Sequence, residues 1–230
     1  MRIDCITFDL DDTLWETGSV LTRAEASFFE WITEHCPRVV ESHDIDSLAD
    51  QRRSHYAGIP ELRHDVTRAR RHWLEHTLRE FGYHDDALVD AGFQRFWEAR
   101  QQVTVFEDVP ALLGALRPRF RVGAITNGNA DVHHIGIGHL FDFVITAGDA
   151  GAAKPEPAIF EAALAAAGAA AEHTVHVGDD PLRDVVGAGR LGMRTVWINP
   201  RLDPWPGGRN PDAVVRHVRE LAELLERWSA

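Results

Sequence analysis

The chain has 230 residues, 44% of them hydrophobic, which suits one globular core with room for a smaller inserted unit. The net charge of -12 at pH 7 excludes a general nucleic-acid binder, because little positive charge is available to neutralise a phosphate backbone. Cys5 and Cys36 lack metal or redox spacing, and neither a signal-peptide pattern nor a long apolar segment is present, so we expect a cytoplasmic protein without disulfides or membrane segments.

The first predicted element is a short buried strand over residues 3–8, directly after the first residues of the chain. From about residue 17 to residue 100, apolar side chains recur at helical spacing, as in Phe28 with Ile32 and Leu74 with Leu78. No convincing strand occurs in this stretch, and breaks fall near Pro37, residues 58–60 and residue 82. The pattern predicts an all-helical insert at residues 16–105.

After residue 106, predicted strands and helices alternate. The strands are expected at 121–126, 143–146, 174–177 and 194–198, and the helices at 109–117, 130–137, 157–167 and 182–191, with a final amphipathic helix at 211–228. Such alternation predicts an α/β protein with a Rossmann-like doubly wound parallel sheet. We expect residues 1–15 and 106–230 to form this core, with the strand at 3–8 in the middle of its sheet.

Polar side chains that core packing does not require follow the predicted strands. They are Asp9, Asp11 and Thr13 after the first strand, Thr126 and Asn127 after the second, Lys154 after the third, and Asp179, Asp180 and Asp184 after the fourth. In an extended chain Asp9 and Asp11 project to the same side, and their repulsion requires a nearby positive charge. Carboxylates with backbone carbonyls suit Mg²⁺, and ligands bind at the carboxyl ends of parallel strands. We therefore expect one metal-assisted site.

Lysine usage gives a second, independent indication. Of the 24 basic residues only Lys154 is a lysine, and all others are arginine. The compact ammonium of lysine does not substitute for the planar guanidinium of arginine. A single lysine placed among the strand-end motifs therefore favours a function over chance survival.

These four motifs, in this order, resemble those of the haloacid dehalogenase superfamily, and the helical insert resembles that family's cap domain. The resemblance implies that Asp9 is a nucleophile that forms an aspartyl phosphate. It implies that Asp11 protonates the leaving alkoxide and then activates water, and that Lys154 neutralises the nucleophile and the transferring charge. It also implies Mg²⁺ as cofactor, held by the Asp9 carboxylate, the Asp11 backbone carbonyl and Asp179.

The resemblance assigns the remaining strand-end residues to the surroundings of the phosphoryl group. Thr126 and the amide of Asn127 would donate hydrogen bonds to the phosphoryl oxygens, beside Lys154. Asp184 would orient Lys154 or a metal-bound water, and Asp180 would support the same region.

Asp11 separates the subclasses of this family. The dehalogenases use one aspartate and lack the second, so the presence of Asp11 favours phosphoryl transfer. The insert contains no lysine, which excludes the Schiff-base mechanism of phosphonate-cleaving relatives. The runs at residues 64–68, 125–130 and 176–180 resemble bacterial phosphatases of flavin mononucleotide and of the phosphoribitylamino-pyrimidine of riboflavin synthesis.

The expected function is therefore the Mg²⁺-dependent hydrolysis of small phosphomonoesters, such as flavin mononucleotide, a riboflavin-pathway phosphate or nucleotides. Two alternatives stay open, a phosphosugar mutase and a non-catalytic protein of the same fold that binds a phosphorylated ligand. We expect the partner to be a small phosphorylated metabolite, with no nucleic acid and no membrane, and the protein to be a monomer or homodimer.

Three other patterns are better explained by structure than by function. The glycines at 187–192 fit a dinucleotide fingerprint, but the run closes a predicted helix where that fingerprint must open one. His72 and His76 fit an inverted zinc-protease pattern without an evident third ligand. The basic run at 64–71 is interpreted as a solvated helix face, with Arg68 as a candidate for contact with an anionic substrate tail.

Overall fold

The computed structural model describes residues 2–229, which divide into two compact units. One unit contains residues 2–16 and 104–229, and the other contains residues 17–103. Within the described range, no helix is both long enough and apolar enough to cross a bilayer.

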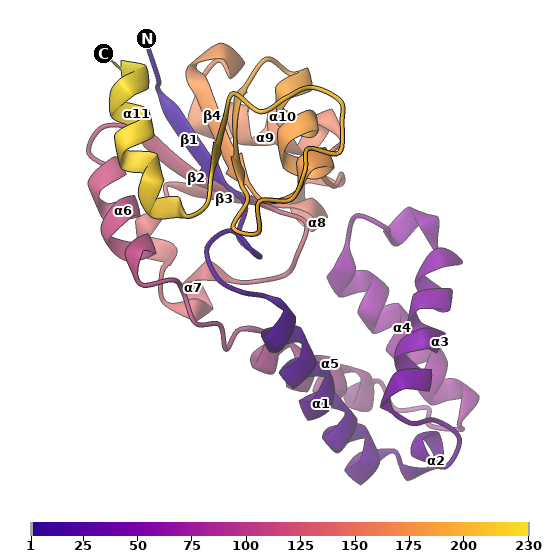
Figure 1. Cartoon of the computed structure of the whole chain (residues 1–230). Coiled ribbons are helices and arrows are strands. Elements are labelled where there is room, and N and C mark those ends of the chain that lie inside the picture. The colour runs from indigo at the N-terminus through magenta and orange to yellow at the C-terminus, as the bar shows by residue number, and fades with distance from the viewer. Residues whose placement is uncertain (1, 230) are drawn as a thin grey trace. The chain divides into compact units, whose positions relative to one another are not determined.

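The first unit is built on a parallel sheet of six strands in the order β3-β2-β1-β4-β5-β6 (Figure 1). The strands are β1 (Cys5–Phe8), β2 (Arg121–Thr126), β3 (Phe143–Thr146), β4 (Thr174–Gly178), β5 (Arg194–Ile198) and β6 (Ala213–Val215). The predicted α/β class and the central place of the first strand are confirmed. Phe8 lies opposite Ala124 of β2 and Val177 of β4, so β1, β2 and β4 end close together.

Helices cover both faces of this sheet, with α6 and α11 on one side and α9 and α10 on the other (Figure 1). The helices are α6 (Asp108–Leu116), α7 (Val132–Ile135), α8 (Ala147–Ala150), α9 (Pro157–Ala167), α10 (Gly187–Arg190) and α11 (Leu221–Ser229). The other helical segments are the π-helix η4 (Pro181–Val186) and the 3-10 turns η2 (Gly138–Leu140), η3 (Ala171–His173) and η5 (Val218–Glu220). Every residue of β1 and β4 is buried, because helices pack on both faces of a parallel sheet.

The prediction of one helix over residues 211–228 was wrong in its first half. Residues 213–215 form β6, which pairs with β5, and the helical part starts only at Val218. The Asp212 carboxylate accepts a hydrogen bond from the Thr195 backbone N–H at 2.9 Å, which fixes the start of this edge strand. β-Branched side chains at 214 and 215 suit a strand, and pairing with β5 decides a pattern that alone also fits a helix.

Residues 17–103 are helical, and this described range contains no strand. Its elements are α1 (Gly18–His35), α2 (Pro37–Val40), α3 (Ile45–Ala57), η1 (Pro60–Leu62), α4 (Val66–Glu80) and α5 (Asp86–Arg100). Aspartates at 44, 65 and 85 cap α3, α4 and α5 by accepting hydrogen bonds from backbone N–H groups. Phe28, Trp73 and Leu74 lie in one buried core of this unit.

An ion pair between the half-buried Glu25 and the buried Arg70 crosses the helical unit. Both carboxylate oxygens of Glu25 on α1 accept hydrogen bonds from the Arg70 guanidinium of α4, each at 2.9 Å. Arg52 of α3 adds a third hydrogen bond at 2.8 Å, and the Arg70 guanidinium lies 3.3 Å from the centre of the Phe96 ring. These contacts connect α1, α3, α4 and α5.

Candidate active site

The site is built at the carboxyl end of β1. The Asp9 backbone N–H donates to the Val177 carbonyl at 2.8 Å, so the residue still pairs with β4 after the strand has ended. Beyond it the chain turns sharply, since Asp12 adopts a left-handed conformation with φ of 59°. The turn brings the buried Trp15 indole back to Asp11, whose carboxylate accepts a hydrogen bond from Nε1 at 2.9 Å. Asp11 therefore has a fixed orientation.

Lys154 lies in the centre of the candidate site. Its Nζ is 2.7 Å from Asp9 Oδ1 and 2.7 Å from Asp184 Oδ1, and its side chain is only 2% exposed. The Asn127 side chain, at the end of β2, holds the lysine backbone in two places. Asn127 Nδ2 donates to the Lys154 carbonyl at 2.9 Å, and the Lys154 N–H donates to Asn127 Oδ1 at 2.8 Å.

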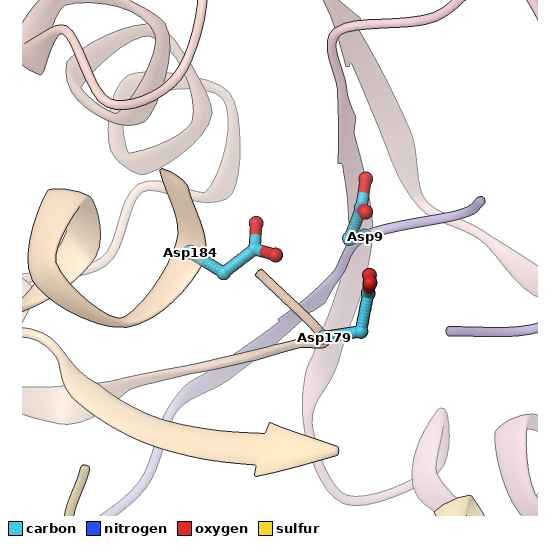
Figure 2. A group of neighbouring side chains, drawn as sticks. All are labelled: Asp9, Asp179 and Asp184. Atoms are coloured by element: carbon cyan, nitrogen blue, oxygen red, sulfur yellow. The ribbon is translucent and has the colours of Figure 1, made fainter. Parts of the chain in front are cut away.

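Two further carboxylates come from the end of β4. Figure 2 shows the carboxylates of Asp9, Asp179 and Asp184 gathered around one region, with Asp9 following β1 and the other two following β4. One oxygen of each lies within 4.8 Å of the others, and this is the one such set of three among the described His, Cys, Asp and Glu residues. Thr13 Oγ1 donates to Asp179 Oδ1 at 3.2 Å, and Trp197 Nε1 donates to the Asp179 carbonyl at 2.8 Å.

The buried charges define the electrostatics. Burial alone lowers the pKa of Lys154, but the Asp184 and Asp9 carboxylates outweigh it, so this pKa lies above its usual value and the group is an ammonium. Burial would raise the pKa of Asp184, yet Lys154 and His176 hold that pKa below its usual range. The Asp184 carboxylate also accepts from the Asp180 backbone N–H at 3.0 Å, so several donors stabilise its charge.

The other two carboxylates are less well compensated. Burial raises the pKa of Asp9 well above its ordinary value, because Lys154 offsets it only in part and Asp184 and Asp179 repel the charge. Burial, followed by repulsion from Asp184 and Asp12, raises the pKa of Asp179 to about 7. When all three carboxylates are ionised, one ammonium leaves two negative charges uncompensated, and a divalent cation with oxygen ligands fits that donor set.

The remaining predicted residues lie around this centre. The Thr126 hydroxyl oxygen, at the end of β2, accepts a hydrogen bond from the Gly128 N–H at 2.9 Å, which leaves its proton to donate. The Asp180 carboxylate is engaged at the start of η4, where it accepts from the backbone N–H groups of Leu182 and Arg183, each at 2.8 Å. Asp180 therefore shapes the backbone beside Asp184.

Sequence reasoning missed three side chains that support this centre, namely Trp15, Trp197 and His176. Trp15 donates a hydrogen bond to the Asp11 carboxylate, Trp197 donates one to the Asp179 carbonyl, and His176 contacts the Asp184 carboxylate. His176 gave a usable signal, because it is the titratable residue inside a fully buried strand. The two tryptophans gave none, since buried tryptophans are common in any core.

The discounted motifs lie where packing explains them. The glycines at 187–192 end a helical segment just before β5, and a Cβ on Gly189 would lie 2.6 Å from the Arg209 side chain. His72 and His76 are exposed on α4 and have His55 beside them, with His55 Nε2 2.8 Å from His72 Nδ1. This trio is not among the described sets whose ligand atoms are close enough for one ion.

Comparison with known proteins agrees with this geometry. The model of the haloacid dehalogenase-like hydrolase family matches residues 3–192. The phosphatase YigB of Escherichia coli K12, named for 5-amino-6-(5-phospho-D-ribitylamino)uracil, is 31% identical over 97% of both chains. The pyrimidine 5'-nucleotidase YjjG of the same organism is 26% identical over 98% of this chain and 99% of its own.

Among solved structures, a protein described as the 2-haloacid dehalogenase of Pseudomonas syringae pv. Tomato DC3000 superposes with a TM-score of 0.92. It is 39% identical, and the match covers 98% of this chain and 99% of that chain. The family match, the curated relatives and this structure all extend over the strand ends that carry the site. The chain thus belongs to the haloacid dehalogenase-like hydrolases.

Proposed function

We propose that the protein is a Mg²⁺-dependent phosphatase of small phosphomonoesters that works through an aspartyl phosphate on Asp9. The observation that carries the proposal is the Lys154 ammonium held between the Asp9 and Asp184 carboxylates. Phosphoryl transfer depends on positioning and charge neutralisation more than on covalent assistance. An ammonium beside a carboxylate nucleophile supports both needs.

In the first step the Asp9 carboxylate attacks phosphorus, and the bond from phosphorus to the ester oxygen breaks. The leaving alkoxide takes a proton from Asp11, which then removes a proton from the water that hydrolyses the aspartyl phosphate. The products are the alcohol, inorganic phosphate and free Asp9. The hydrogen bond from Trp15 supports this role, because it holds the Asp11 carboxylate in one orientation.

Lys154 acts in this proposal as a fixed cation and not as a base, because its raised pKa keeps it protonated. It lowers the cost of bringing a phosphate dianion to the Asp9 carboxylate. The Thr126 hydroxyl and the backbone amide of Asn127 are proposed to donate to the phosphoryl oxygens. The side-chain amide of Asn127 has another task, since it holds the Lys154 backbone.

The cation site that we propose consists of the Asp9 carboxylate, the Asp11 backbone carbonyl and Asp179. When bound, Mg²⁺ supplies charge neutralisation for the phosphoryl oxygens and a fixed orientation for in-line attack. Thr13 and Trp197 hold Asp179 in place through its carboxylate and its carbonyl, respectively. Asp184 is assigned to Lys154, because the hydrogen bonds around it already neutralise its charge.

We propose that residues 17–103 form a cap that selects the substrate, and that the substrate is flavin mononucleotide, a phosphate of the riboflavin pathway or a nucleotide. The names of YigB and YjjG, with matches over nearly the whole chain, support this range. We place the protein in the cytosol, as a monomer or homodimer, and the two buried free cysteines support a reducing compartment.

One observation favours a second candidate, the hydrolytic dehalogenation of 2-halocarboxylic acids. The solved structure with 39% identity is described as a 2-haloacid dehalogenase. In that reaction the Asp9 carboxylate would displace halide from carbon, and no acid would be needed for the leaving group. The presence of Asp11 argues for the phosphatase, because a leaving alkoxide needs a proton and a halide does not.

The deciding experiment is a parallel assay of the purified protein on p-nitrophenyl phosphate, flavin mononucleotide, nucleoside monophosphates and 2-chloropropionate. We expect phosphate release that EDTA abolishes and Mg²⁺ restores, with no chloride release. Asp9→Asn should abolish turnover without changing the far-UV circular dichroism spectrum. Chloride release without phosphate release would replace the proposal by the second candidate. Conversion of a sugar phosphate to its isomer without phosphate release would identify a mutase, and no turnover at all would leave a binding protein.

A further inference from the structure

A continuous chain of hydrogen bonds runs behind the site, through a histidine that the proposed mechanism does not use. Thr7 Oγ1 lies 2.8 Å from His176 Nδ1, and His176 Nε2 lies 3.1 Å from Asp184 Oδ1. That same oxygen is 2.7 Å from Lys154 Nζ, and Lys154 Nζ contacts Asp9 at the far end of this series of hydrogen bonds. Thr7 and His176 are each 1% exposed, so water does not compete for these contacts.

The direction of each hydrogen bond follows from the groups involved. An ionised carboxylate only accepts, so His176 must donate to Asp184 from Nε2. Burial lowers the pKa of His176, which keeps the imidazole neutral, and its Nδ1 then accepts from the Thr7 hydroxyl. The alternative acceptor for that hydroxyl, the Val175 carbonyl, is farther away at 3.4 Å. These hydrogen bonds therefore fix one tautomer of His176, with the proton on Nε2.

Packing prevents the imidazole and the carboxylate from moving to other partners. The Phe160 ring stands edge-on to His176, with ring centres 5.3 Å apart and planes at 85°. Asp184 lies against the backbone of Gly178, where an added Cβ would be 2.2 Å from its Cγ. The Asp184 carboxylate thus has room for one position, and in that position one oxygen faces both His176 and Lys154.

We propose that His176 is a positioning residue, which holds Asp184 by its Nε2–H and thereby fixes the Lys154 ammonium beside Asp9. It touches neither the nucleophile nor the phosphoryl group, so it acts only through Asp184. Without this donor the Asp184 oxygen that faces Lys154 loses one of its two partners, and the ammonium is held less firmly beside Asp9. The kinetic consequences of this inference rest on the proposed function, whereas the placement of the Lys154 ammonium does not.

Kinetics test the role with a variant and its conservative counterpart. His176→Leu removes the donor at similar size, and we expect kcat on p-nitrophenyl phosphate to fall about 10 to 100-fold, as for other residues that orient a site residue. KM should stay within about twofold, because the residue does not contact substrate in this mechanism. His176→Gln offers an amide N–H near the position of Nε2 and should recover most of the loss. His173→Leu serves as the control, because His173 precedes the first residue of β4, at the end of the strand away from the site.

The single lysine permits a readout that does not need turnover. Protein labelled with ¹⁵Nζ-lysine and ¹³Cε-lysine gives one side-chain signal, which is that of Lys154. We expect this signal to shift or broaden in His176→Leu and to return near its wild-type position in His176→Gln. If His176→Leu does not fold, Thr7→Val and Thr7→Ser test the same hydrogen bonds. Thr7→Val should shift the Lys154 signal, and Thr7→Ser should leave it near its wild-type position.

The outcomes separate the two proposals. An unchanged lysine signal and unchanged kcat in folded His176→Leu would overturn the positioning role. Equal losses in His176→Leu and His176→Gln would also overturn it, because they would show a need for the imidazole as packing and not as donor. If wild-type protein has no phosphatase activity while the lysine signal responds as expected, the positioning role holds and the proposed function fails.

Discussion

Gly178→Ala is the most specific perturbation that the structure offers, because one methyl group reaches a single buried carboxylate. Gly178 ends β4, and an added Cβ would lie 2.2 Å from Cγ, 2.3 Å from Oδ2 and 2.6 Å from Cβ of Asp184. Carbon atoms in contact are normally about 3.5 to 4.0 Å apart, so the added Cβ would lie about 1 to 2 Å too close to Cγ and Cβ of Asp184.

Relief of this overlap requires Asp184 to leave its partners. Its carboxylate holds Lys154 at 2.7 Å and the Asp180 N–H at 3.0 Å, and these bonds break if it moves. Overpacking in a core costs about 1 to 3 kcal/mol, and the lost charge-assisted bonds put the expected cost near the upper end. For a chain of this size, about 3 kcal/mol corresponds to a decrease in Tm of roughly 6 to 12 °C.

The assays are thermal unfolding followed by circular dichroism, and kcat on p-nitrophenyl phosphate with Mg²⁺. We expect kcat of Gly178→Ala to fall at least about 100-fold, since Lys154 loses its second carboxylate partner. Gly114→Ala, inside α6, is the matched control because an added Cβ there meets no atom within 4 Å. It should raise stability by about 0.5 to 1 kcal/mol and leave kcat unchanged.

A Gly178→Ala variant that melted at the wild-type temperature and retained wild-type kcat would refute the proposed role of Asp184. That result would mean that Asp184 can move freely without loss, and hence that its contact with Lys154 matters neither for the fold nor for the chemistry. A loss of stability with normal kcat at low temperature would limit the role of the contact to the fold.

Two further predictions concern the two units separately. Asn127→Ala removes both hydrogen bonds to the Lys154 backbone, so kcat should fall about 10 to 100-fold, and an unchanged kcat and lysine NMR signal would contradict this role. Glu25→Gln should destabilise the helical unit by about 3 kcal/mol at pH 7, because it leaves Arg70 buried without its carboxylate. Burial alone would raise the pKa of Glu25, but Arg70 and Arg52 hold that pKa below its usual value. The stabilisation is therefore complete above the unfolded pKa of about 4.3 and is lost as pH falls through the folded pKa. Urea unfolding at several pH values should show the difference between variant and wild type shrinking below about pH 4, and a constant difference would contradict the assignment.

The closed space around Lys154 explains why a lysine stands at this position while the other basic residues are arginine. The Lys154 ammonium contacts two carboxylates through one nitrogen atom, in a space that is closed to solvent. A guanidinium would spread its charge over a planar fork and would need a wider opening between Asp9 and Asp184. Arginine elsewhere in the chain serves sites where that fork fits, as Arg70 shows by pairing with both oxygens of Glu25.

Sequence patterns were sufficient for the parallel sheet, and they predicted a helical insert at residues 16–105, a range in which the structure has helices between Gly18 and Arg100. Alternating strands and helices, and apolar residues at helical spacing, are averages over many positions, so single exceptions do not change them. The prediction at residues 211–228 was wrong because too few residues were available there for an average over positions to be reliable. Three residues ahead of a helix became an edge strand because β5 offered unpaired backbone groups beside them.

For the candidate site, the sequence by itself determined which residue types stand at the strand ends, and the fold then brought Asp9, Lys154 and Asp184 together. Only the tertiary structure decided how these groups are held, through Asn127 on the Lys154 backbone and His176 on Asp184. Hydrogen-bond partners depend on strand register and side-chain packing between segments far apart in the chain, and no local pattern records that information.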